Sequence, residues 1–304
     1  MSRMSRLTRP PEGRRVVVRV RALVVVALAA VLGSASAASA DYAITHFETS
    51  ASTYEAGAHA DVTTTFQFSD QGVDAFFRLV PDGHTRRLEI DMPTGLVGNP
   101  TNFPRCTREA FTANACPAAS QVGVASLDLA GFPPGIINNV PVFNLEPSAN
   151  EPALIGLKVG VLINAYIRIK VRPDGGGLTA VVDDLPFGSA LLKNSITLWG
   201  VPADHNGSGA ERRPFMANPT KCGHTPVTTL RAWSYEEPDE PRVATSTNDT
   251  GHNCETLTFS PTMTVTPSER TAGSATGLNV RITVPQSVRP DGHATAHVRE
   301  VRLV

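Results

Sequence analysis

The stretch Arg87–Cys116 reads RLEIDMPTGLVGNPTNFPRCTREAFTANAC and decides how the chain folds. Its first residues alternate, because Leu88, Ile90 and Met92 are separated by acidic residues, and a period of two is typical of a half-buried strand. Pro93 cannot donate a ladder hydrogen bond, and the Pro-Thr-Gly and Gly-Asn-Pro tripeptides that follow are typical of turns. The stretch therefore predicts a strand, a series of turns and a loop that has a cysteine at each end.

Similar alternating segments recur along the chain, which has 304 residues, 24 glycines and 24 prolines. Many short strands separated by Gly- and Pro-containing turns favour a sandwich or a barrel. We predict an all-β fold of antiparallel Ig-like β-sandwich units with long loops, after an N-terminal signal helix. One helical turn capped by Thr107 is expected in the cysteine loop. The predicted strands are residues 41–50, 60–68, 76–80, 87–92, 121–129, 139–145, 153–161, 164–171, 178–182, 195–201, 228–235 and 254–265.

Residues 1–40 have the pattern of a secretory signal peptide. Arg14–Arg21 is basic, Ala22–Gly33 is apolar and uncharged, and Ser34–Ala40 consists of small residues. Because a membrane-spanning helix needs roughly 20 apolar residues, we predict cleavage after Ala40 and an extracellular or cell-surface location. The alternative is an uncleaved leader that anchors the protein, which is the only expected contact of the chain with a membrane.

The charge balance argues against two classes of partner. Residues 1–40 hold seven Arg and one Glu, so the remaining chain has 20 basic and 27 acidic residues. An acidic chain is repelled by nucleic acids and by anionic membrane surfaces. The mature protein is therefore not expected to bind either of them.

The four cysteines predict disulfide bonds. An even number of cysteines in an exported chain favours disulfides, and four cysteines allow three pairings. We favour Cys106–Cys116 and Cys222–Cys254, because each pair closes a local loop. Metal binding is the alternative, but the chain has no Cys-x-x-Cys pair.

A partial repeat divides the chain. The tetrapeptide Pro-Asp-Gly-His occurs at residues 81–84 and again at 290–293, and each copy follows one alternating strand and precedes another. The coincidental recurrence of a common turn is the alternative. We predict a signal peptide over residues 1–40, β domains over 41–147 and 148–260, and the start of a further, incomplete β repeat over 261–304.

Several motifs together resemble a family of large exported actinobacterial proteins with many β domains. They are MPTGLVGNP (92–100), PRC (104–106), CP (116–117), QVG (121–123), VFNLEP (142–147), LWGVPAD (198–204) and NPTKC (218–222). The resemblance covers nearly all of residues 41–304. It implies a secreted or surface-attached β protein, and it brings no catalytic residues to this chain.

Motifs that carry catalytic chemistry are missing from the sequence. It has no Gly-x-Ser-x-Gly elbow, no His-Glu-x-x-His helix and no phosphate-binding loop. The neighbouring carboxylates Asp183-Asp184 and Glu236-Glu237 point to opposite faces if they lie on strands, so neither pair forms an acid/base couple by itself. We expect no catalytic residue, no metal and no cofactor.

Four residues are candidates for ligand binding. Trp199 and Trp233 are the only tryptophans, and Asp204 and His205 lie in a loop shortly after Trp199. Core packing of both indoles is the alternative interpretation, because both lie in strong strand patterns. A stacking platform for a sugar or peptide is the functional one.

These observations predict an exported cell-surface or envelope-associated β protein with a structural, adhesive or binding role. The expected partner is an unknown surface protein or glycan. The alternatives are a secreted hydrolase, glycosidase or peptidase, with an unrecognised carboxylate site, and a carbohydrate-binding module.

Overall fold

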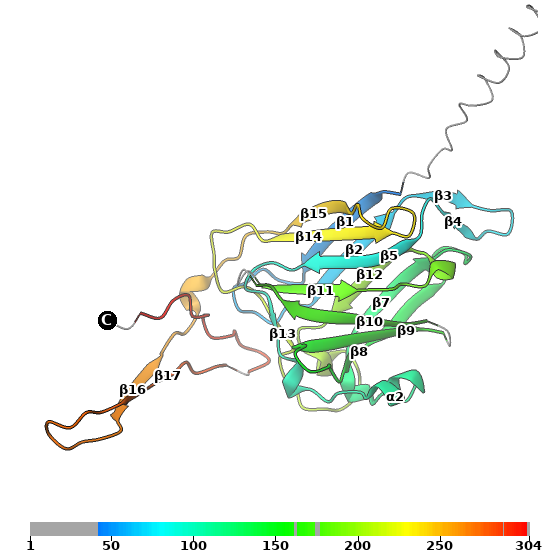
Figure 1. Cartoon of the computed structure of the whole chain (residues 1–304). Helices are drawn as coiled ribbons and strands as arrows, with labels where there is room; N and C mark the ends of the chain where they lie inside the picture. The colour runs from blue at the N-terminus through cyan, green and yellow to red at the C-terminus, as the bar shows by residue number, and fades with distance from the viewer. Residues whose placement is uncertain (1–41, 161–162, 174–176, 288, 303–304) are drawn as a thin grey trace, which may run out of the picture. The chain divides into compact units, whose positions relative to one another are not determined.

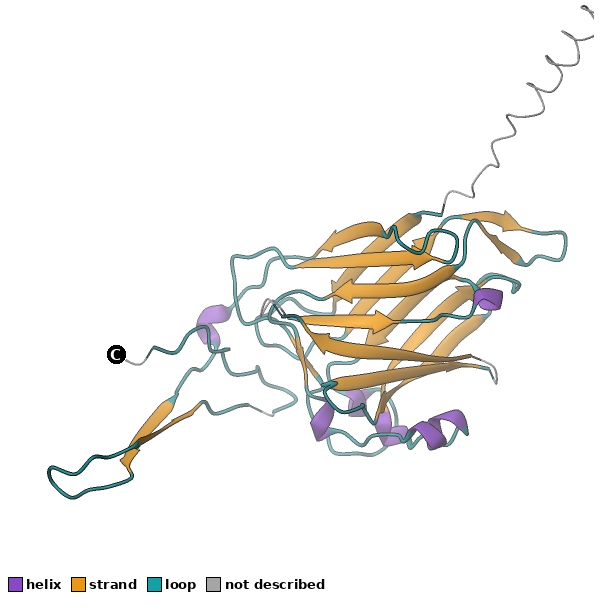
Figure 2. Cartoon of the chain, in the orientation of Figure 1, coloured by secondary structure: helices purple, strands orange, loops and turns teal. Residues whose placement is uncertain are grey.

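The computed structural model describes residues 42–160, 163–173, 177–287 and 289–302 (Figure 1). The predicted signal peptide, residues 1–40, lies outside these ranges. Strands dominate the described chain, and the helical turns are short (Figure 2).

Eleven strands of the described chain form one antiparallel sheet. Its order is β1-β2-β12-β7-β8-β9-β10-β11-β5-β14-β15, so β12 is inserted between strands of the first half of the sequence and β5 between strands of the second half. Strand bounds are β1 Ile44–Ala51, β2 Val62–Phe68, β5 Thr85–Asp91, β7 Gln121–Leu129, β8 Ile137–Leu145, β9 Ala153–Val159, β10 Ile163–Val171, β11 Leu178–Val182, β12 Leu191–Leu198, β14 Val227–Ser234 and β15 Arg242–Thr247.

The sheet is nearly closed into a barrel, because its first and last strands are joined by side chains. In β1, Thr49 bonds to Ser246 of β15, and at the other end of this seam the Arg242 guanidinium donates to the Tyr42 carbonyl at 2.7 Å. The prediction of an all-β antiparallel fold is confirmed. The Ig-like sandwich is not confirmed, since β12 pairs with β2, and β5 pairs with both β11 and β14, which merges the strands into one curled sheet.

The boundary predicted between residues 147 and 148 lies inside this sheet. Strands β8 and β9 pair across it, from Val142 with Leu157 to Leu145 with Leu154. Residues 42–304 form one compact unit. The acidic, Pro-containing stretch 236–253 contains β15, because its Val-Ala-Thr-Ser-Thr run pairs with β14.

A short helix covers the outer face of β8, β9 and β10. It is α2 (Arg108–Thr112), and the Thr107 hydroxyl accepts from the Ala110 N–H at 3.1 Å, as the sequence predicts. Phe111 is fully buried and meets the Tyr166 ring edge-on at 5.5 Å. Gly156 permits this packing, since a Cβ there would lie 2.4 Å from a Leu145 methyl carbon.

The remaining elements are short and lie outside the large sheet. The strands pair as β3 with β4, β6 with β13 and β16 with β17. Their bounds are β3 Asp70–Val73, β4 Leu79–Pro81, β6 Val97–Gly98, β13 Met216–Ala217, β16 Thr262–Pro267 and β17 Leu278–Thr283, and the 3-10 turns are Pro100–Asn102, Ala118–Ser120, Phe187–Ser189, Pro202–Asp204 and Cys254–Thr256.

The loop of the β16–β17 hairpin has the same length and the same closing hydrogen bonds as the loop of the β1–β2 hairpin. In β1–β2 the last pair is Ala51 with Val62, and in β16–β17 it is Pro267 with Leu278, so the two loops have equal length. The Ser52 N–H donates to the Asp61 carbonyl at 2.9 Å, and the Ser268 N–H donates to the Gly277 carbonyl at 2.8 Å. The hydroxyl of Ser52 also accepts from the Asp61 N–H, and the hydroxyl of Ser268 accepts from the Gly277 N–H.

Candidate functional site

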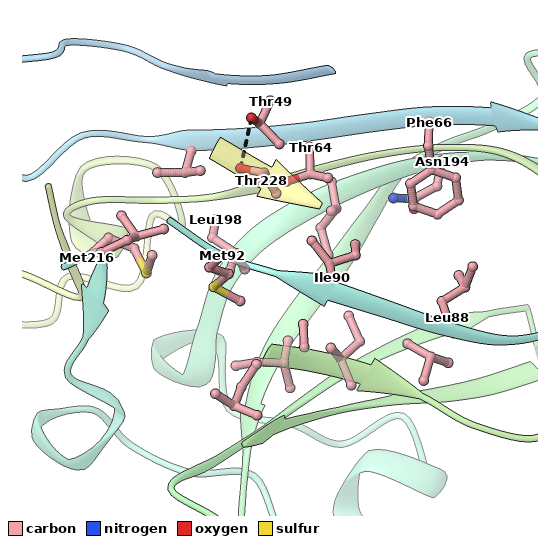
Figure 3. A pocket seen from close by; sticks show the side chains of 18 of the residues that line it. Thr49, Thr64, Phe66, Leu88, Ile90, Met92, Asn194, Leu198, Met216 and Thr228 are labelled. Carbon is pink, nitrogen blue, oxygen red and sulfur yellow. Dashed lines mark hydrogen bonds between the residues drawn. The ribbon is translucent and has the colours of Figure 1, made fainter. Parts of the chain in front are cut away.

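The inner face of the sheet encloses an apolar cavity of about 170 Å³ (Figure 3). Strands of period two supply its wall, because alternate side chains point inward. In β10, residues 163, 165, 167 and 169 line the cavity, while Arg168 and Lys170 point outward. The aliphatic and aromatic lining includes Val62, Phe66, Leu88, Ile90, Met92, Leu127, Leu129, Ile155, Leu157, Val159, Ile163, Ala165, Ile167, Ile169, Val182, Leu191, Ile196 and Leu198.

Polar loops border one end of the cavity. We call this end the mouth and define it by Tyr54, Lys221, Asn248, Asp249 and Gly251. Strands β1, β5, β12 and β15 end near the mouth and β14 begins there. Lys221 and Asp249 are exposed, so the cavity reaches solvent at this end.

A disulfide ties the two mouth loops together. Cys222 bonds to Cys254 with a Cα–Cα distance of 5.9 Å, and these cysteines follow Lys221 and Gly251 closely in sequence. The other disulfide joins Cys106 to Cys116, with a Cα–Cα distance of 5.2 Å, in the loop that carries α2. These are the two local pairs that the sequence favours.

Buried hydroxyls close the wall near the mouth. Thr49 Oγ1 lies 3.2 Å from Thr228 Oγ1, the contact drawn in Figure 3. The Thr49 hydroxyl also reaches Asn248 Oδ1 at 3.0 Å. His59 Nδ1 lies 2.9 Å from the carbonyl of Met216, which also lines the cavity, and burial lowers the pKa of His59. A neutral His59 that donates from Nδ1 fits this contact.

Comparisons with known proteins give no family for the chain. A scan against models of protein families finds no match, and searches of curated proteins and of solved structures find none either.

Three of the four predicted ligand residues lie together, outside the cavity. Trp199 follows β12, is 8% exposed and stacks on His205 with ring centroids 5.0 Å apart. His205 Nε2 lies 3.2 Å from an Asp61 carboxylate oxygen. The Arg212 guanidinium donates to Asp204 and lowers the pKa of that carboxyl. The indole therefore packs as core, and Asp204 already has a charged partner.

Trp233 lies at the other end of the barrel from Trp199. It is the penultimate residue of β14, which starts at the mouth, and it is partly exposed with the Arg87 guanidinium 5.4 Å from its ring. The structure does not bring the two tryptophans into one platform. A hollow of about 250 Å³ beside the Asp204 loop is lined by Asn206, Glu211 and Arg213, but by neither indole.

Carboxylates on the outer face of the sheet are engaged by basic side chains. Asp183 pairs with Arg87 at 2.9 Å and with Arg168. Burial alone would raise the pKa of Asp91, but hydrogen bonds from Thr179 and Arg231 outweigh it and lower that pKa. Such paired carboxylates hold strands together.

The adjacent pair Glu236-Glu237 is also divided between two partners. Glu236 accepts from His84 at 2.7 Å, and Glu237 pairs with Arg242. His293 Nε2 lies 3.2 Å from a carboxylate oxygen of Glu55. Over the described ranges, no group of three or more His, Cys, Asp and Glu side chains is placed to hold a metal, and no helix is both long and apolar enough to span a membrane.

Proposed function

We propose that the barrel is a binding protein for an apolar, chain-like molecule, which it holds in the cavity described above. The observation that carries this proposal is a continuous aliphatic lining that reaches solvent through a polar mouth. Ligand sites are typically concave and apolar with a few placed polar groups. An apolar cavity of roughly 150 Å³ is large enough for a benzene molecule.

The shape of the cavity favours a single alkyl chain. Its lining extends along β10 from Ile163 to Ile169, which corresponds to roughly 20 Å of strand. A volume of about 170 Å³ over that length makes a narrow channel. Each methylene buried in it contributes about 0.8 kcal/mol, so a long chain gains affinity with length.

Export to the cell surface or envelope is part of the proposal. Its support is the leader pattern of residues 1–40, the two disulfides and the motif resemblance to exported actinobacterial proteins. Intact mass of the secreted protein tests it. A chain that starts at Asp41 and gains two hydrogens per disulfide on reduction is expected. An unprocessed chain with free thiols would contradict export.

Displacement of anilinonaphthalene sulfonate by stearic acid from residues 41–304 tests the binding function. The variant Ala165→Trp places an indole in the cavity and should weaken stearic acid binding at least tenfold. Lys170→Trp is the matched control, because Lys170 lies on the same strand, is exposed and points outward. Absence of stearic acid binding to the wild type, or equal affinities of both variants, would contradict the proposal.

A further inference from the structure

Asn194 contributes an amide to the apolar wall of the cavity, which Asn218 and Asn248 also line. It lies in β12, is 6% exposed and lines the cavity beside Phe66, its partner residue in β2 (Figure 3). Within the described part of the chain, no hydrogen-bond partner reaches its side chain. Burying an unbonded amide costs its desolvation free energy, so this residue needs a partner that the wall does not supply.

The other buried amides and hydroxyls near the mouth are already satisfied. The Asn218 amide donates to the carbonyls of Thr53 and Glu55 at 2.8 and 3.0 Å. Thr49 and Thr228 bond to each other, and Asn248 accepts from Thr49. Asn194 therefore differs from these residues, which hold loops and strands together.

One further polar side chain lies near Asn194. Thr64 of β2 also lines the cavity, and it is a diagonal neighbour because Ile196 pairs with Thr64 while Asn194 pairs with Phe66. The Thr64 hydroxyl likewise has no hydrogen-bond partner among the described residues. The two side chains form a small polar spot, and most of the residues that line the cavity around them are apolar.

We infer that the ligand carries a hydroxyl or carbonyl oxygen part-way along its apolar chain and that Asn194 hydrogen bonds to this oxygen. The inference rests on the binding function proposed above. An amide has two donors and one acceptor, so it can bond either group. Asn194 lies four residues before the end of β12 at Leu198, or roughly 13 Å from the mouth, which places the oxygen near mid-chain.

The test compares stearic acid with a mid-chain hydroxystearic acid, each displacing anilinonaphthalene sulfonate. Wild-type protein should bind the hydroxylated acid about threefold to tenfold more tightly, which is the range of one neutral hydrogen bond. A hydroxyl next to the carboxylate should bring no gain. Asn194→Leu should abolish the preference and bind stearic acid at least as well.

Controls separate this inference from the binding function. Lys193→Leu changes an exposed neighbour on the same strand and should keep the preference. Equal affinity of wild type for both acids, or a preference that persists in Asn194→Leu, would overturn the role of Asn194 while the binding function stands. If neither acid displaces the probe, the binding function itself fails. If Asn194→Leu does not fold, equal affinity of the wild-type protein for the two acids still overturns the inference.

Discussion

The backbone N–H of Thr49 donates to the hydroxyl of Ser246 at 2.9 Å, although these residues belong to the two outermost strands of the sheet. The Thr49 hydroxyl also contacts Thr228, Ser246 and Asn248. The barrel is thus closed between β1 and β15 by side chains, where every other pair of neighbouring strands is joined by a backbone ladder.

Thr49→Val should destabilise the barrel. The isosteric change removes the hydroxyl from a buried network of three partners, and leaving such groups unpaired costs about 1–3 kcal/mol. The free energy of unfolding from denaturant titration measures the loss. Thr63→Val is the control, because Thr63 bonds to Thr197 in a less buried position, and it should cost under about 1 kcal/mol. Equal losses of unfolding free energy in the two variants would contradict a particular role of Thr49 in closing the barrel between β1 and β15.

The two disulfides should differ in their effect on ligand binding. Replacing Cys222 and Cys254 by Ser opens a loop of 32 residues at the mouth and should cost about 3–4 kcal/mol of stability and weaken stearic acid binding. Replacing Cys106 and Cys116 opens a loop of 10 residues on the outer face and should cost about 2–3 kcal/mol, with affinity unchanged. A parallel loss of affinity in both variants would contradict the role of the mouth loops.

His59 should make the protein less stable in mild acid. Burial lowers the pKa of His59 below its ordinary value of 6.5, so the unfolded chain takes up the proton first. Stability is then lost as the pH falls from about 6.5 toward the lowered pKa of the folded state. In His59→Asn the amide can still donate to Met216 but does not titrate, so this dependence should become smaller. His297, whose pKa is also lowered by burial, still contributes to it. Unfolding free energies between pH 5 and pH 7 test it, with the exposed His46→Asn as the control that keeps the dependence.

Local features could be predicted from the sequence because they depend on neighbouring residues. Strand β7 begins and ends where the alternation of residues 121–129 predicts, and so does β11 at 178–182. Thr107 caps α2, because its hydroxyl needs only the free N–H of Ala110, three residues later, as a hydrogen-bond donor.

The cavity could not be predicted, because its wall depends on which strands pair. Strand β12 lies between β2 and β7, so Ile196 and Thr64 become neighbours although they are far apart in sequence. The position of Asn194 could not be predicted for a local reason. The sequence predicts a strand that starts at residue 195, because an irregular register between Leu191 and Lys193 interrupts the alternation before it.

The β16–β17 hairpin should exchange its amide hydrogens much faster than the β1–β2 hairpin, although their loops have equal length and the same closing hydrogen bonds. All six residues of β17 are exposed, whereas Phe66 and Phe68 of β2 are buried and β2 pairs on both sides. An isolated two-stranded hairpin is marginally stable in water. Hydrogen exchange followed by mass spectrometry should show β2 protected to near the global unfolding free energy and β17 almost unprotected. Equal protection of β2 and β17 would contradict this prediction. It would show that another surface covers β17, as β12 covers β2, and a second barrel that begins at residue 261 would require such a surface.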